Sequence, residues 1–255
     1  DWSSDVCSSD LVTSLTSDQL NKLTTIQLQN LNVNGIGSLS TSIIGALDST
    51  HIAALTTTQI QSLSNTQISA ISTTAFGALN TSQISALTAS QATGLTTTQS
   101  MSLFGSDNKI SALSPNALTK LTTANIGNLS STQLRTLSTS QIQGLSTSVF
   151  NTLSSTQLLG LTTDQITAIT QSQIKSLDLS RMVSTAQFAA LPAYDIAALD
   201  ANTITGLTSS QLQALTATQI KGLKLTQVQA LSTSQIQLLT SSQIPQLTIE
   251  AIKGL

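Results

Sequence analysis

The stretch Leu137-Ser138-Thr139-Ser140-Gln141-Ile142-Gln143-Gly144 carries the pattern that nearly all of the chain repeats. Leu145 begins the next copy at once, so the unit is an octad of the form Leu-(Ser/Thr)-x-x-Gln-Ile-x-small. The frame holds for 29 octads, over residues 15–102, 105–176 and 183–254. So regular a period indicates a repeat architecture, in which each unit is stabilised by its neighbours.

A period of eight residues fits neither a continuous helix nor a continuous strand. On a helix, each octad would turn the leucine position by about 80° around the axis, so no apolar stripe would form. On a strand, positions 1 and 6 would face opposite sides. The regular structure must therefore break once in every octad.

Positions 2 and 5 show where each element begins. Position 2 is Ser, Thr, Asp or Asn in 27 of 29 octads, the exceptions being Pro192 and Lys224, and position 5 is Gln in 18 of 29. Side chains of the first set cap helix N-termini, and Gln three residues later completes a capping box. The pattern predicts a helix N-cap at position 2 and a short helix over positions 3 to 8.

The apolar positions 1 and 6 agree with this prediction. With position 2 as N-cap they are N′ and N4, the two places that a hydrophobic staple joins. Position 1 is apolar except at Gly105, and position 6 is a large apolar residue except at Ala92 and Ser100. Position 8 is Gly, Ala or Ser in 21 of 29 octads, which predicts close approach of neighbouring backbones.

A single octad cannot fold alone. Burial of one Leu and one Ile contributes roughly 3–6 kcal/mol, whereas ordering the backbone of eight residues costs about 8–16 kcal/mol. We therefore predict an all-α solenoid of very short capped helices, one in each octad. The alternative fold is a β-solenoid with ladders of Gln and Thr, although the 12 glycines are few for a turn in every coil.

Residues 1–10, DWSSDVCSSD, lie outside the pattern and hold Trp2 and Cys7, the chain's single Trp and Cys. They resemble the in-frame translation of a sequencing adapter, and we interpret them as a non-native leader. Residues 11–255 then form one predicted repeat domain without cysteine. Its register breaks at residues 103–104, a two-residue insertion, and at 177–182, six extra residues, where we expect bulges or kinks.

The composition offers little chemistry. Charged residues make up 8% and aromatic residues 2% of the chain, so it has neither a basic stripe for nucleic acid nor a store of aromatic anchors. No apolar run approaches the ~18–20 residues that span a bilayer. His51, the single histidine, takes the place of Gln at position 5, which favours a structural role, and no serine lies in a Gly-x-Ser-x-Gly elbow.

The charged residues are scattered along the chain. The acids lie mostly at capping or first-turn positions, where they favour the helix dipole: Asp18, Asp48, Asp107, Asp164, Asp178, Asp195, Asp200 and Glu250. Seven bases mostly lie late in their octads, with Lys224 at position 2 as the exception: Lys22, Lys120, Arg135, Lys175, Lys221, Lys224 and Lys253. We expect no catalytic, cofactor-binding or metal-binding residue, no cofactor, and no enzyme activity.

The runs LTTTQI, LSTSQI and LTSSQI resemble octapeptide tracts of large bacterial secreted or surface proteins of the adhesin-like kind. The resemblance implies an extracellular or cell-surface location. The partner is unknown, with a cell-surface or extracellular polymer as one candidate. It favours a structural spacer or interaction surface. The alternative function is direct binding of a repeating ligand, such as a polysaccharide or ice, by the Ser/Thr/Gln surface.

The two folds differ in their far-UV circular dichroism. Because every octad carries its own cap and staple, we expect the spectrum of residues 11–255 to be mainly helical despite the Ser and Thr content. A single minimum of the β type would contradict the short-helix fold.

Overall fold

The computed structural model describes residues 12–103 and 109–248, and contacts divide the chain into two compact units, Asp1–Leu129 and Ser130–Leu255. The described residues contain short helices and no β-strand, so the β-solenoid alternative is wrong and the all-α prediction is confirmed. The proposed leader 1–10, Phe104 of the first register break, and the acids Asp107 and Glu250 lie outside the described residues, as does Lys253. The expectation of one repeat domain over 11–255 stays a prediction.

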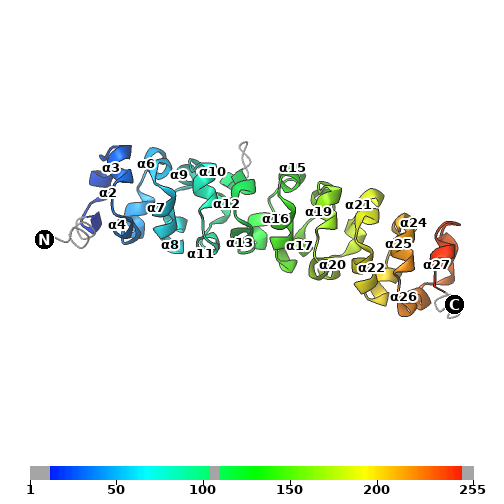
Figure 1. The fold of residues 1–255 in the computed structure, drawn as a ribbon. Helices are drawn as coiled ribbons and strands as arrows, with labels where there is room; N and C mark the ends of the chain where they lie inside the picture. Colours follow the sequence, from blue (N-terminus) through cyan, green and yellow to red (C-terminus); the bar gives the residue numbers. More distant parts are fainter. Residues whose placement is uncertain (1–11, 104–108, 249–255) are drawn as a thin grey trace. The chain divides into compact units, whose positions relative to one another are not determined.

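The helices of the first unit are four to seven residues long, with one 3-10 helix, η1, among them (Figure 1). Their bounds are α2 Ser17–Leu20, α3 Thr25–Gln29, α4 Val33–Gly37, α5 Thr41–Gly45, α6 Ser49–Ala54, α7 Thr57–Ser62, α8 Asn65–Ala70, α9 Thr73–Gly77, α10 Thr81–Ser85, α11 Ala89–Thr93, α12 Thr97–Leu103, η1 Lys109–Ala112, α13 Pro115–Leu118 and α14 Thr123–Ile126.

The second unit continues the same succession, with two further 3-10 helices, η2 and η3 (Figure 1). The bounds are α15 Ser131–Arg135, α16 Thr139–Gly144, α17 Thr147–Thr152, α18 Ser155–Leu159, α19 Thr163–Thr167, α20 Gln171–Ser176, η2 Leu179–Arg181, α21 Thr185–Ala190, α22 Ala193–Ala198, α23 Ala201–Thr205, α24 Ser209–Ala214, α25 Ala217–Lys221, α26 Leu225–Ala230, α27 Thr233–Leu238 and η3 Ile244–Gln246.

The octad 137–144 shows how the sequence starts and stops each helix. The Ser138 hydroxyl accepts the N–H of Gln141 at 3.2 Å, and the Gln141 Oε1 accepts the N–H of Ser138 at 2.8 Å, which is the predicted capping box. Helix α16 ends at Gly144, and the next two residues, Leu145 and Ser146, have extended backbone angles. Two extended residues thus reverse the chain between successive helices, and the predicted unit is confirmed.

The apolar positions form the core. Position 6 is almost completely buried in the described octads from Leu20 to Val228, and position 1 is buried in those from Leu39 onward, apart from Val183. Position 1 of the first octads, at Leu15, Leu23 and Leu31, is only half-buried. The staple pair of each octad therefore stabilises its own helix and also forms the apolar contact with other octads.

The stacking follows a rule of third neighbours. Within each unit, the extensively contacting helix pairs are separated by two intervening helices, as in α4 with α7, α5 with α8 and α22 with α25. The 3-10 helices η1 and η2 count as members of the series, since α10 contacts η1 and α19 contacts α21 across α20 and η2. Three octads therefore make one turn of the stack.

The side chain of the position-5 glutamine joins successive turns. While its Oε1 accepts the N–H of its own N-cap, its Nε2 donates to main-chain carbonyls of the preceding turn. Gln91 Nε2 lies 2.6 Å from the carbonyl oxygen of Ile60 and 2.7 Å from that of Leu63. Leu63 follows a helix end, where carbonyls lack intrahelical partners, so the amide satisfies an oxygen that the helix leaves unpaired.

This bond between turns recurs along both units. The glutamines whose Nε2 donates to the preceding turn are Gln59, Gln67, Gln83, Gln91, Gln99, Gln165, Gln173, Gln187, Gln211, Gln219, Gln227, Gln235 and Gln243. Most of these amides are buried, although amides are usually found at the surface.

The break at 177–182 is a shortened repeat and not a loop. Leu177 is buried as at position 1, the Asp178 carboxylate caps the 3-10 helix η2 by accepting the N–H of Ser180, and Met182 is buried. Because η2 keeps its place in the series, the three-helix turn continues through the break.

The octad frame fails directly after this break. The frame puts Val183 at position 1, but Val183 is 62% exposed, whereas the neighbouring Met182 is 1% exposed. Val183 is thus an extra residue between Met182, which lies in the core, and the N-cap Ser184. Helix α21 lacks the reciprocal half of its capping box. The Oε1 of Gln187 is consequently buried without a hydrogen-bond partner.

Small residues at position 8 allow the predicted close approach. A Cβ built on Gly94 would lie 2.3 Å from the carbonyl oxygen of Asn65, and one built on Gly160 would lie 2.5 Å from that of Ser131. Both contacts are with position 3 of the octad one turn earlier. Side chains at these two glycines would therefore push the turns apart.

Two matched substitutions distinguish the contribution of the bond between turns to stability from the contribution of the capping box. Gln91→Ala removes both, whereas Gln27→Ala removes a capping box alone, because Gln27 makes no bond to a preceding turn. We expect Gln91→Ala to lower the free energy of unfolding by about 1–3 kcal/mol more than Gln27→Ala, since it leaves buried carbonyls unpaired. Urea unfolding followed by circular dichroism measures the difference, and equal losses would contradict the role of the amide.

Candidate functional site

His51 occupies a structural position in the octad 47–54. Its Nε2 lies 3.1 Å from the carbonyl oxygen of Leu23, so the ring donates to the preceding turn as the Gln amides do. Its Nδ1 lies 2.7 Å from Oδ1 of Asp48, the N-cap of α6, which also accepts the main-chain N–H of His51. Within the described residues no group of His, Cys, Asp and Glu could hold a metal ion.

Three aspartates at N-caps accept hydrogen bonds that favour their charged forms. Hydrogen bonds from the main chain and side chain of His51 hold the pKa of Asp48 below its ordinary value of 3.8. The Ser180 hydroxyl and N–H lower the pKa of Asp178, and Thr203 lowers that of Asp200. These carboxylates are capping groups, as the sequence predicts.

Asp195 departs from the prediction. It lies in the first turn of α22, but its side chain is completely buried, and neither carboxylate oxygen has a hydrogen-bond partner. Burial raises the pKa of this carboxyl above 3.8. The favourable interaction with the helix dipole that the sequence suggests is therefore outweighed by the loss of water. Its neighbour Tyr194 points outward and is 65% exposed.

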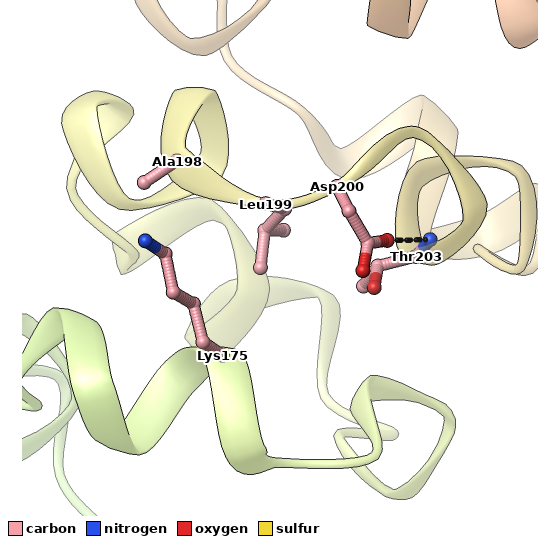
Figure 2. Close-up of a pocket in the computed structure, with 5 residues that line it drawn as sticks. All are labelled: Lys175, Ala198, Leu199, Asp200 and Thr203. Atoms are coloured by element: carbon pink, nitrogen blue, oxygen red, sulfur yellow. Dashed lines mark hydrogen bonds between the residues drawn. The ribbon is translucent and has the colours of Figure 1, made fainter.

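A groove in the second unit brings two opposite charges near each other without pairing them. Its lining consists of Lys175, Ala198, Leu199, Asp200 and Thr203. Figure 2 shows the Lys175 side chain reaching toward Ala198, while the Asp200 carboxylate turns to the Thr203 amide, whose nitrogen lies 2.6 Å from Oδ1. Because the acid is engaged as a helix cap, the groove does not present a paired acid and base.

Two further grooves border the shortened repeat. One is lined by Leu177, Asp178, Leu179, Ser180, Thr203, Gly206 and Leu207, and the other by Ser180, Met182, Val183, Thr185, Thr208, Ser210 and Gln211. The carboxylate among these residues, that of Asp178, is bonded to Ser180. Both grooves offer hydroxyl and apolar surface beside the shortened repeat.

Helix starts present exposed hydroxyl groups. Position-2 hydroxyls are engaged as caps, but position 3 is exposed at Thr57, Thr73, Thr81 and Thr97. Helices α7 and α10 stack on each other, as do α9 and α12, so these threonines recur from turn to turn. These threonines form a recurring hydroxyl surface in the described part of the first unit.

Two basic side chains also donate hydrogen bonds to the preceding turn. Arg181 donates from one guanidinium nitrogen to the Leu153 carbonyl at 2.9 Å and from the other to Oδ1 of Asn151 at 2.7 Å. Lys109 donates to the Gly77 carbonyl at 2.6 Å. Sequence reasoning did not single out these two residues, although each stands at position 5 of its unit, where Gln is usual.

Stacked short helices with capped starts define a helical repeat protein. Residues 44–81 match the sequence model of the ALTTAQ repeat, within a tract whose short-helix pattern extends through both units. A search of curated proteins found no match to the chain. None of the described helices has the length and apolar character needed to cross a membrane.

The capping aspartates predict an acid limit of stability. Because the pKa of Asp48 is lowered in the folded state, its contribution is present above the unfolded value of 3.8 and is lost as pH falls through the lower, folded value. We expect Asp48→Asn to reduce the loss of stability below about pH 4, measured as the urea midpoint against pH. If the urea midpoint of the variant falls below pH 4 as steeply as that of the wild type, this role of Asp48 is contradicted.

Proposed function

We propose that this chain is a non-enzymatic spacer whose function depends on the number of its octads. The observation that carries the proposal is the recurrence of one contact, the position-5 amide on the carbonyls of the preceding turn, along both units. Because each added octad makes equivalent contacts, length can change without a new type of interface. The residues that depart from the octad, such as His51 and Arg181, make structural bonds.

The proposed setting is the surface of a bacterial cell, as part of a large exported protein. The resemblance of the LTTTQI and LSTSQI runs to tracts of adhesin-like surface proteins supports this setting. A low charge content and a surface rich in hydroxyls suit a segment that holds other domains apart without binding them. A cell-surface or extracellular polymer is the proposed partner of the parent protein.

A second candidate function is binding of a repeating ligand, such as a polysaccharide or ice. The exposed position-3 threonines favour it, because they recur on stacked helices. The position-2 hydroxyls do not, because they are engaged as caps. If this candidate holds, affinity rises steeply with octad number through multivalency.

Deletion of whole and half octads tests the unit on which the spacer depends. Removing Leu55–Ser62 leaves α10 to stack on α6 in place of α7, with equivalent carbonyls for Gln83. Removing only Leu55–Thr58 destroys one cap and puts the remaining half out of phase. We expect the half deletion to lower the melting temperature several times more than the whole deletion, and equal losses would contradict the octad as the unit.

A second experiment distinguishes the spacer function from the binding function. Proteins of about 10, 20 and 29 octads are compared by small-angle scattering and assayed against a panel of polysaccharides and for ice recrystallisation. The spacer predicts a maximum dimension that grows in proportion to octad number, with no binding. Length-dependent binding that is lost when Thr57, Thr73, Thr81 and Thr97 are changed to Ala would overturn the spacer.

A further inference from the structure

From the octad 47–54 onward, most of the described polar residues at position 5 donate hydrogen bonds to the preceding turn. The thirteen glutamines named above do so through Nε2, and four other residue types take the same role. They are His51 with the Leu23 carbonyl, Lys109 with the Gly77 carbonyl, Asn125 with the Ser100 hydroxyl, and Arg181 with the Leu153 carbonyl. Buried oxygens of one turn are thus paired with donors of the next.

Asp195 occupies position 5 but is not a donor when ionised. An ionised carboxylate only accepts hydrogen bonds. The N-cap of its octad, position 2, is Pro192, which has no N–H for the carboxylate to accept and no side-chain cap. Both carboxylate oxygens of Asp195 are therefore buried without a partner on either side.

The preceding turn presents oxygens to this carboxyl. The Gln187 amide, one octad earlier, donates to the carbonyls 29 and 26 residues before it, those of Leu158 and Leu161. The same offsets from Asp195 lead to the carbonyls of Ile166 and Ile169. By this register an ionised carboxylate would face carbonyl oxygens, which accept hydrogen bonds as it does, whereas a protonated carboxyl carries a donor that can pair with one of them.

No cation among the described residues compensates the negative charge of an ionised Asp195. The helices packed on α22 are α20, which carries Lys175, and α25, which carries Lys221; both side chains are exposed. The adjoining α21 has no charged residue, and the segment that leads into α23 contributes Asp200, whose carboxylate caps that helix. On α22 itself the other titratable group is the exposed Tyr194. None of the described cations is paired with Asp195.

We propose that octad 191–198 is an acid-tightened seam in the repeat stack, in which protonated Asp195 donates its O–H to the Ile166 or Ile169 carbonyl and the ionised form loosens this contact. Acidification thus strengthens one defined junction between turns. Where another described position-5 residue bonds to the preceding turn, the donor is a Gln, Asn, Lys, Arg or His side chain, and Thr203 carries no carboxyl, so among the described position-5 residues this response is confined to Asp195.

The direction of the pH dependence follows from the linkage between proton binding at Asp195 and folding. Burial raises the folded-state pKa of Asp195, so the folded state holds the proton to a higher pH than the unfolded chain. The stabilisation is complete below the unfolded value of 3.8 and is lost as pH rises through the folded value. The stabilisation that the capping aspartates contribute is lost in the opposite direction, as pH falls below 3.8. The two effects therefore occupy different pH ranges.

Hydrogen exchange of the full chain tests the proposal at the seam itself. Protection factors of the amides between residues 188 and 207 are measured from about pH 4 to pH 8, corrected for intrinsic exchange. In the wild type we expect them to fall with rising pH, by at most about tenfold per pH unit. In Asp195→Asn they should stay level and exceed the wild type at pH 8, because the amide donates as Asn125 does.

Two further variants complete the design. Pro192→Ser with Asp195→Gln restores the usual octad Leu-Ser-x-x-Gln-Ile and should show the same level profile with higher protection. Asp164→Asn, at the exposed first turn of α19, is the matched control and should keep the wild-type pH dependence. Equal pH dependence in the wild type and in Asp195→Asn would overturn the proposal.

A measurement on the wild type needs no variant to fold. The side-chain carboxyl carbon of Asp195, labelled with 13C and assigned by comparison with Asp195→Asn, should titrate above pH 3.8. Titration at or below 3.8 would overturn the proposal.

Discussion

The stack depends on one bifunctional side chain, the glutamine at position 5. Its Oε1 closes the capping box of its own helix, and its Nε2 binds the end of a helix one turn earlier. In Gln173 these two roles are seen together, with Oε1 2.8 Å from the N–H of Thr170 and Nε2 2.7 Å from the Leu145 carbonyl. Helices of five or six residues are too short to be stable alone, so a side chain that fixes both a helix start and a neighbouring helix end couples local order to stacking.

Chemistry explains which substitutions the stack accepts at this position. Asn125 provides both an acceptor for the N–H of its cap residue and a donor for the preceding turn, while His51, Lys109 and Arg181 provide the donor. Asp195 in its ionised form lacks the donor for the preceding turn, and it coincides with Pro192, which removes the N–H that its carboxylate could accept. The octad 191–198 is therefore an exception in its hydrogen bonds, although its apolar residues are buried as usual.

The local unit could be predicted because its information lies within eight residues. A capping box and a staple use contacts three to five residues apart, so Ser138, Gln141 and Ile142 indicate a helix start without reference to any other octad. The lack of a predicted catalytic or metal site has a similar origin, since a residue such as His51 had no second ligand in the sequence. The ALTTAQ match over residues 44–81 agrees with a repeat and leaves the specific function as a proposal.

What the sequence by itself determined is the octad: the caps, the apolar pair, the helix over positions 3 to 8, and the small residue where backbones meet. Only the tertiary structure decided that three octads make a turn, that the glutamine amide bonds to carbonyls 28 and 31 residues earlier, and that Met182 replaces Val183 in the core. It also decided that Asp195 is buried. The reason is physical: these features depend on which octads come into contact, and identical octads carry no label that distinguishes the third neighbour from the second or the fourth.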